Sequence, residues 1–481
     1  MPYTVHSDHD RRHMLETIGI SSVEDLFTQI PEQLRTVTPS PCPDGLSEQE
    51  LRFRVDALAA RDRLPGPRCF LGAGSYRHFV PAAVRALVSR GEFATAYTPY
   101  QPEVSQGTLE HIFEFQTCIC ELTGMDVSNA SLYDGASALA EGAFMALRAT
   151  RSESIVVSAG VHPEHRQVLA TYASGPEFAI HELPLDPGPG TTVVPGRAAA
   201  AGAAGTPELP PGTGALLVQQ PNYLGIIEDL APLAEAAHAA GALLVVSVNP
   251  APLGLLEAPG ALGADIVVGD AQVFGCPPSF GGPSVGFLAC RKEHLRQIPG
   301  RLVSQTVDED GRVCYTLTLQ AREQHIRRAR ATSNICSNQA LSALAATIHL
   351  ALLGPKGLQD RAALCLRRAH HLHSRLCALP GVRPLADGPF FNEFGILLPY
   401  PAREFRAAMR AHGVDPGVPV ERLWRGQTMN ERAAQIAETA LLVAVTELNP
   451  PEALEAYIQA AGAVLGNRPA GWCDDPERVA P

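Results

Sequence analysis

Short runs of apolar and β-branched residues alternate with longer amphipathic segments between about residues 66 and 330. The runs predict strands at 154–158, 215–219, 243–248, 266–268 and 285–289. Between them lie segments with helical periodicity, such as 229–240 (DLAPLAEAAHAA). Continuous apolar strands separated by helices are typical of a mostly parallel sheet buried on both faces. The pattern therefore predicts a large α/β domain over residues 66–330.

The first 65 residues are predicted to form an arm of helices. Ser21-x-x-Glu24 and Ser47-x-x-Glu50 both match the capping box that begins a helix. The histidines and carboxylates between His6 and His13 are interpreted as the solvated start of a helix rather than a metal site.

The chain after residue 330 changes from alternating elements to mainly helical ones. A long helical stretch, an aromatic-edged strand (PFFNEFGILLP) and a final helix (EALEAYIQAAGAVL) predict a smaller α+β domain over 331–465. Residues 466–481 are predicted to form a disordered tail. The Ala/Gly/Pro-rich stretch 186–213 is interpreted as a surface excursion, because the α/β pattern resumes directly after it.

Composition narrows the possible partners. The chain has 481 residues and a formal net charge of −12, which disfavours nucleic acids and anionic membranes as partners. The N-terminus lacks the apolar region of a leader, and no apolar run has the length needed to span a bilayer, so a cytoplasmic protein is expected. The 11 cysteines include no CxxC pair and are expected to be reduced.

Five segments together resemble one protein family. They are FLGAGSYRHFVP (70–81), AYTPYQPEVSQGTLE (96–110), GALLVQQPNYLGIIED (214–229), GDAQVFGCPPSFGGP (269–283) and LQAREQHIRRARATSNICSNQ (319–339). These segments resemble the glycine decarboxylase (P-protein) family of the glycine cleavage system. The likeness is to its N-terminal type, which is a separate α subunit in many prokaryotes, and it covers nearly the whole chain.

The resemblance implies a fold, a partner and a reaction. The fold would be that of the type I transferases that depend on pyridoxal phosphate (PLP). A homologous β subunit would carry the PLP in an α2β2 complex. That complex would decarboxylate glycine and pass the aminomethyl group to the lipoyl group of the H-protein.

Three positions that a PLP site needs can be examined in this chain, and two of them carry a side chain that does not suit the cofactor. In the type I fold, the loop after the strand 266–268 carries the lysine that binds the cofactor covalently, and Gln272 stands there. The strand 243–248 would end in an aspartate that pairs with the pyridine nitrogen, and Asn249 follows it. The turn 133–137 opens a helix and could bind phosphate, although such turns are common in α/β domains. We therefore expect no catalytic PLP on this chain.

Two alternatives remain open from the sequence. The chain has only two lysines, Lys292 and Lys356, and a self-sufficient PLP enzyme would have to use one of them. Both lie outside the cofactor loop, which disfavours this alternative. The other alternative is a structural partner that contributes no active-site group.

A loop rich in tyrosine and proline is the best candidate for a substrate pocket. Its polar side chains precede or begin a helix, on a backbone stiffened by Pro99 and Pro102; they are Tyr97, Thr98, Tyr100, Glu103, Ser105 and Gln106. Polar aromatic groups on a rigid loop suit the wall of a small-substrate site. A subunit contact is the alternative, and both can hold, since the family's active site lies near the contact between subunits.

Two further groups have less specific interpretations. The sequence REQHIRR (322–328) predicts a helix on which His325 lies beside Arg322 and Arg328, most simply at a solvated or interface surface. His162 follows a strand and either reaches the pocket or begins a helix.

Overall fold

The computed structural model describes residues 5–35, 43–61, 66–94, 97–186, 188–196, 208–423 and 436–466. The described chain divides into two units, Met1–Leu64 and Pro65–Pro481. The tail predicted to be disordered lies outside the described residues from 467 onward.

The first unit consists of short helices. They are α1 (Asp8–Ile18), η1 (Val23–Phe27), α2 (Glu32–Arg35) and α3 (Glu48–Ala59). The capping box of Ser47 and Glu50 is confirmed, whereas the other predicted box is displaced by one residue. Ser22 caps η1, because its hydroxyl accepts the backbone N–H of Asp25 at 3.3 Å. In return, the carboxylate of Asp25 accepts the backbone N–H groups of Ser21 and Ser22, each at 2.9 Å. None of the described residues in these helices is buried, so they have no core of their own.

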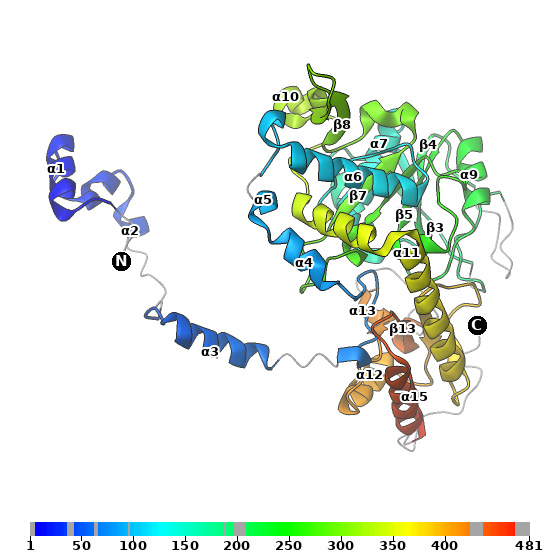
Figure 1. Ribbon diagram of the computed structural model, residues 1–481. Coiled ribbons are helices and arrows are strands. Elements are labelled where there is room, and N and C mark those ends of the chain that lie inside the picture. Colours follow the sequence, from blue (N-terminus) through cyan, green and yellow to red (C-terminus); the bar gives the residue numbers. More distant parts are fainter. Residues whose placement is uncertain are drawn as a thin grey trace. The chain divides into compact units, whose positions relative to one another are not determined.

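The second unit is built on a seven-stranded sheet of order β1-β7-β6-β5-β4-β2-β3 (Figure 1). Strands β3, β2, β4, β5 and β6 are parallel, and β7 and β1 are antiparallel to their neighbours. The strands are β1 (Val127–Ser128), β2 (Ser154–Ser158), β3 (Ala179–Leu183), β4 (Thr213–Gln220), β5 (Leu243–Val248), β6 (Ile266–Asp270) and β7 (Gly286–Cys290). All five predicted strands are confirmed.

Helices cover both faces of this sheet. The helices are α6 (Gln106–Thr123), α7 (Gly135–Thr150), α8 (Pro163–Ser174), α9 (Leu230–Ala239) and α11 (Ala340–Cys377). On one face, α6, α9 and the first half of α11 pack over Leu244 and Val246 of β5. On the other face, α7 and α8 pack with Val245. Successive side chains of β5 thus enter opposite cores, which explains why its sequence LLVVSV is apolar at all positions but one.

The C-terminal residues form a smaller antiparallel sheet of order β10-β11-β13-β12 with helices against it. Its elements are β10 (Arg383–Pro384), β11 (Glu393–Leu397), α12 (Ala402–Ala411), β12 (Val418–Pro419), α13 (Val420–Leu423), β13 (Ala440–Ala444) and α15 (Pro451–Gly466). Ala369, Leu372 and Leu376 from the second half of α11 belong to its core. The α11 helix therefore joins the large sheet to the small one (Figure 1).

By length and apolar composition, α11 resembles a membrane span. Its backbone is broken at Gly354, where φ is 60° and ψ is 178°, with Pro355 directly after it. Of its most apolar stretch, 44% is buried inside the protein. Because each half packs into a core of the same unit, we interpret α11 as two core helices joined at a kink.

A hairpin and several short helices complete the unit. The hairpin joins β8 (Leu302–Val307) to β9 (Val313–Thr318), and the segment 322–328 follows it. The short elements are η2 (Gly66–Arg68), α4 (Ala82–Val88), α5 (Gly91–Ala94), η3 (Pro102–Val104), η4 (Ala251–Gly254), η5 (Ala271–Val273), η6 (Lys292–Gln297), η7 (Gln320–Arg322), α10 (Gln324–Arg327) and η8 (Arg328–Arg330).

Two local predictions are wrong. The segment 322–328 is not one helix, because Arg328 adopts a φ of 52° that ends α10. The stretch 186–213, of which 187 and 197–207 lie outside the described residues, is not wholly a surface excursion. Thr192 and Val193 are buried, and the backbone N–H of Thr192 donates to the carboxylate of Glu228 at 2.8 Å.

Candidate functional site

A cavity of about 390 Å³ opens at the carboxyl ends of β4, β5 and β6. Ligands of open α/β sheets bind at this edge. Residues from the starts of α7 and α8, the segment 74–76, the loop after β6, and Asn392 and Glu393 at the start of β11 complete its walls. The large sheet and the small sheet thus both contribute to the cavity.

Gln272 lines this cavity directly after β6. Its side-chain amide donates to the backbone carbonyls of Cys276, at 2.5 Å, and Tyr76, at 3.3 Å. The amide is therefore committed to holding the loop. Neither lysine of the chain lines the cavity: Lys292 is exposed on η6, and Lys356 is exposed and forms an ion pair with Asp360.

Asn249 lines the cavity at the end of β5. Its side-chain oxygen accepts the backbone N–H of Ala251 at 3.1 Å and so caps its own turn. A neutral amide at this position provides no negative charge for a protonated pyridine ring.

The N-terminus of α7 is occupied by carboxylates of the protein. Asp134 is the N-cap residue, and its carboxylate accepts the N–H of Ser137 at 2.7 Å. Asp270, at the end of β6, accepts the N–H of Gly135 at 3.1 Å. Helix N-termini attract anions, but here two acidic side chains take that place and would repel a phosphate.

These residues do not fit PLP. The cavity offers an amide where the cofactor needs an amine, and a second amide where it needs a carboxylate. It offers two carboxylates where it needs free N–H groups. Each substitution disfavours a different part of the cofactor, so we assign no reaction step to PLP in this cavity.

Two histidines lie on the α8 side of the cavity. His162 is the N-cap of α8 and lines the cavity, so both interpretations of this residue are confirmed. Its Nδ1 accepts the N–H of Glu164 at 3.1 Å, and its Nε2 lies 3.0 Å from the carbonyl of Ala73. Burial lowers the pKa of His162 and lowers that of the neighbouring His165 to about 4, so both rings are neutral near pH 7.

Glu393 is a buried carboxyl group in the cavity wall that sequence reasoning missed. It accepts the hydroxyl of Tyr76 at 2.7 Å and the N–H of Ala73 at 2.6 Å. Burial raises its pKa to about 7, although both hydrogen bonds lower it. The sequence does contain an indication of this buried carboxyl group, because Glu393 lies inside the mainly apolar segment PFFNEFGILLP.

The tyrosine loop does not line this cavity. Tyr97 is 83% exposed and Tyr100 is 55% exposed. The ring of Tyr100 lies 6.3 Å from that of His325, and the guanidinium of Arg301 lies 5.7 Å from its centre. The loop therefore presents its phenols on the surface beside the β8–β9 hairpin.

The other residues of the loop have different environments. The hydroxyl of Thr98 is buried and has no hydrogen-bond partner among the described residues. Glu103 is exposed, and Ser105 is the half-buried N-cap of α6. Gln106 exchanges two hydrogen bonds of 2.9 Å with the backbone of Tyr315 and so ties the loop to β9.

Arg322 uses its side chain to hold the backbone together rather than to bind a ligand. Its guanidinium donates to the carbonyls of Gly300, at 3.1 Å, and of Ile298. These contacts hold the segment that follows the β8–β9 hairpin against the segment that precedes it. Arg327, Arg328 and Arg330 are exposed.

Comparison with known proteins gives the family. The family model described as "Glycine cleavage system P-protein" matches residues 1–408. A curated relative from Desulforamulus reducens is 50% identical over 395 residues, which cover 82% of this chain and 86% of the relative. A relative from Rhodospirillum rubrum is 48% identical over 468 residues, which cover 97% of this chain and 100% of the relative. Both are named "Probable glycine dehydrogenase (decarboxylating) subunit 1".

Solved structures agree with this assignment. A crystal structure of "glycine decarboxylase (P-protein) of the glycine cleavage system, in inhibitor-bound form" is 46% identical, with a TM-score of 0.84, and covers 97% of this chain and 100% of that one. A structure of a sphingosine-1-phosphate lyase from Burkholderia pseudomallei is 16% identical, with a TM-score of 0.61, and covers 91% of this chain and 95% of that one. At this identity the similarity supports the fold alone. The predicted type I fold of PLP-dependent enzymes is confirmed, and the chain belongs to the glycine cleavage system P-protein family.

Proposed function

We propose that this chain is the α subunit of a glycine dehydrogenase (decarboxylating) made of two kinds of subunit. The observation that carries the proposal is its similarity, over nearly its whole length, to proteins named subunit 1 of that enzyme. The complex releases the carboxyl carbon of glycine as CO2 and transfers the aminomethyl group to the lipoyl group of the H-protein. It is an α2β2 assembly that acts in the cytoplasm.

In this proposal the β subunit holds the PLP and this chain does not. The misfit of the cavity supports that division, since Gln272 replaces the lysine and Asn249 leaves the pyridine nitrogen without an anion. The cofactor supplies the electron sink for decarboxylation. This chain provides groups that orient glycine and exclude water.

The exposed apolar surface supports a permanent partner. Helix α3 carries several large apolar side chains, and all are exposed: Leu51, Phe53, Val55 and Leu58. Permanent complexes commonly bury more than roughly 2,000 Å² and cover such side chains. We therefore assign part of the contact with the β subunit to the N-terminal helices.

The tyrosine loop is the segment we assign to the substrate site. Its exposed Tyr97 and Tyr100 face away from this chain's own core and are free to meet a neighbouring subunit. Glycine has no side chain, so selectivity must come from groups that orient its carboxylate. Phenol hydroxyls can donate to it, and a hydrogen bond to a charged group is worth about 1.5–3 kcal/mol. Glu103 would repel the carboxylate and instead orients the donors or faces the amine.

The test uses the assembled complex with Tyr97→Phe or Tyr100→Phe. Each change removes one hydroxyl and keeps the ring. At least one of them should lower glycine decarboxylation at least tenfold, which corresponds to about 1.4 kcal/mol of transition-state stabilisation. PLP content and assembly should stay intact. Tyr172→Phe, on α8, is the matched control and should retain full activity.

Two results would change the proposal. If both loop variants keep full activity and glycine affinity, the loop is only a subunit contact and the chain is a structural partner. If the chain purified alone carries PLP that borohydride attaches to one of its lysines, it is a self-sufficient PLP enzyme. We expect the chain alone to be colourless and inactive in glycine–bicarbonate exchange.

A further inference from the structure

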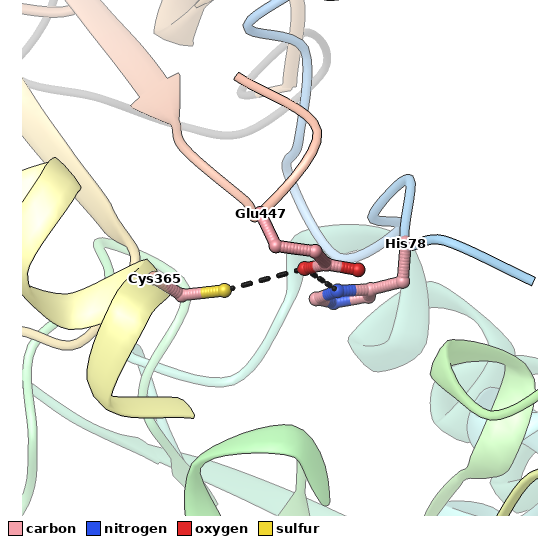
Figure 2. A group of neighbouring side chains, drawn as sticks. All are labelled: His78, Cys365 and Glu447. Carbon is pink, nitrogen blue, oxygen red and sulfur yellow. Dashed lines mark hydrogen bonds and ion pairs between the residues drawn. The ribbon is translucent and has the colours of Figure 1, made fainter. Parts of the chain in front are cut away.

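A group of three side chains lies outside the cavity: the buried His78 and Cys365 and the partly buried Glu447 (Figure 2). They come from the segment before α4, from α11 and from the loop after β13. His78 Nδ1 lies 2.8 Å from Glu447 Oε2, and Cys365 Sγ lies 3.4 Å from the same oxygen. One ligand atom from each residue lies within 4.8 Å of the others.

We infer that these three residues bind one divalent transition-metal ion of the zinc class. An imidazole nitrogen, a thiolate and a carboxylate are the donors that Zn²⁺ uses in proteins, and the thiolate disfavours Mg²⁺ and Ca²⁺. Three protein ligands leave one position of a tetrahedral ion for water. The inference does not depend on the proposed decarboxylase function.

The hydrogen bonds of the cluster show how an ion would enter it. Without metal, Glu447 Oε2 accepts from Nδ1–H of His78 and from the thiol of Cys365. Metal binding moves the imidazole proton to Nε2 and releases the thiol proton to solvent, so that both donor atoms face the ion. Nε2 of His78 has no hydrogen-bond partner among the described residues. No donor to Nε2 therefore holds the imidazole in the form that is protonated on Nδ1.

The surrounding charges set the strength of the site. Arg361 lies one helical turn before Cys365, with its guanidinium 5.0 Å from the centre of the Phe274 ring and donating to the carbonyl of Val273 at 3.2 Å. Exchange of the thiol proton for a divalent ion adds one positive charge near this cation. Binding is therefore expected to be weaker than at a structural site with four protein ligands.

The ion would join three parts of the fold. The cavity residue Tyr76 lies two positions before His78, and Glu447 lies in the loop after β13, an inner strand of the small sheet. The Oε1 atom of Glu447 also accepts the N–H of Phe79 at 2.7 Å, so the carboxylate already joins two of these segments. The bound ion would add a link to α11 and stabilise the cavity wall.

The test is a Co²⁺ titration of the full-length chain, without an affinity tag and after removal of metals with a chelator. Cobalt bound to a thiolate produces a near-ultraviolet charge-transfer band. We expect the band to saturate at one ion per chain, to disappear on addition of Zn²⁺, and to be lost in Cys365→Ser and Glu447→Gln. The midpoint of thermal unfolding should rise when Zn²⁺ is added and return to its initial value when a chelator is added.

Matched variants separate this site from other ligands. Cys290→Ser alters an equally buried thiol in the large sheet and should retain the band. His9→Ala combined with His13→Ala removes imidazoles of α1 and should retain it as well. No band with the wild-type chain, or a band that survives Cys365→Ser, would refute the site. If Cys365→Ser does not fold, the stoichiometry and the displacement by Zn²⁺ in the wild-type chain decide.

Discussion

At the scale of single residues, the cavity lies at the strand ends where open α/β sheets bind ligands, but the side chains that line it do not fit PLP. Asn249 was identifiable from sequence because it directly follows a predicted strand, and Gln272 because it lies in the short loop after another, since a strand end in a parallel sheet has a fixed location. The position of Asp270 at the start of α7 was not identifiable. Asp270 reaches Gly135 only through the tertiary fold, across 135 residues.

The carboxylates give a prediction about restoring the lysine. Gln272→Lys should not yield a chain that binds PLP, because Asn249 is neutral and Asp134 and Asp270 repel the phosphate. The variant is incubated with PLP, reduced with borohydride and analysed by mass spectrometry, and residue 272 should remain unmodified. A stoichiometric adduct at that lysine would contradict our account of the cavity.

Glu393 gives a prediction about pH. Burial raises its folded pKa from the usual 4.5 to about 7, so between these values the folded chain holds a proton that the unfolded chain has released. Its contribution to stability is therefore full below pH 4.5 and is lost as pH rises through 7. One pKa unit is about 1.36 kcal/mol, so the total is roughly 3 kcal/mol. Glu393→Gln mimics the protonated form.

The measurement is the unfolding free energy at several pH values. The wild-type chain should lose stability between pH 5 and 8 relative to Glu393→Gln, which lacks this titration. Tyr76→Phe removes one hydrogen bond to the carboxylate and serves as the comparison. Parallel pH profiles of the wild-type chain and Glu393→Gln would show that Glu393 does not titrate in this range.

At the scale of elements, the sequence was most informative for strands whose burial on both faces produces a distinct apolar pattern. The five predicted strands are mainly apolar runs because both of their faces are buried. Strand β3 was missed because its residues are mostly exposed at the sheet edge. The predicted helix over 322–328 failed because the contacts of Arg322 with two distant carbonyls fix a different backbone.

The β8–β9 hairpin was also missed, and its attachment gives a prediction. Gln106→Ala removes the two hydrogen bonds to Tyr315 that hold β9 to the tyrosine loop. Two such bonds are worth about 1–2 kcal/mol, so local opening should increase roughly 5- to 30-fold. Hydrogen exchange should be faster in 302–318 and unchanged in α7. Gln101→Ala, an exposed change in the same loop, should leave the hairpin protected.

At the scale of the whole molecule, the N-terminal helices have no core of their own, and we propose that they contact the β subunit. Phe53 on α3 is 65% exposed, and none of the described residues of that helix is buried. Phe53→Ser should therefore change the stability of the isolated chain by less than about 0.5 kcal/mol. Burial of such a side chain at an interface is worth about 1.5–3 kcal/mol, so the affinity for the β subunit should fall roughly 10- to 150-fold.

Asp56→Ser, on the same helix, is the control. Sedimentation of each variant with the β subunit measures the affinity, and unchanged binding by Phe53→Ser would exclude this side chain from the interface.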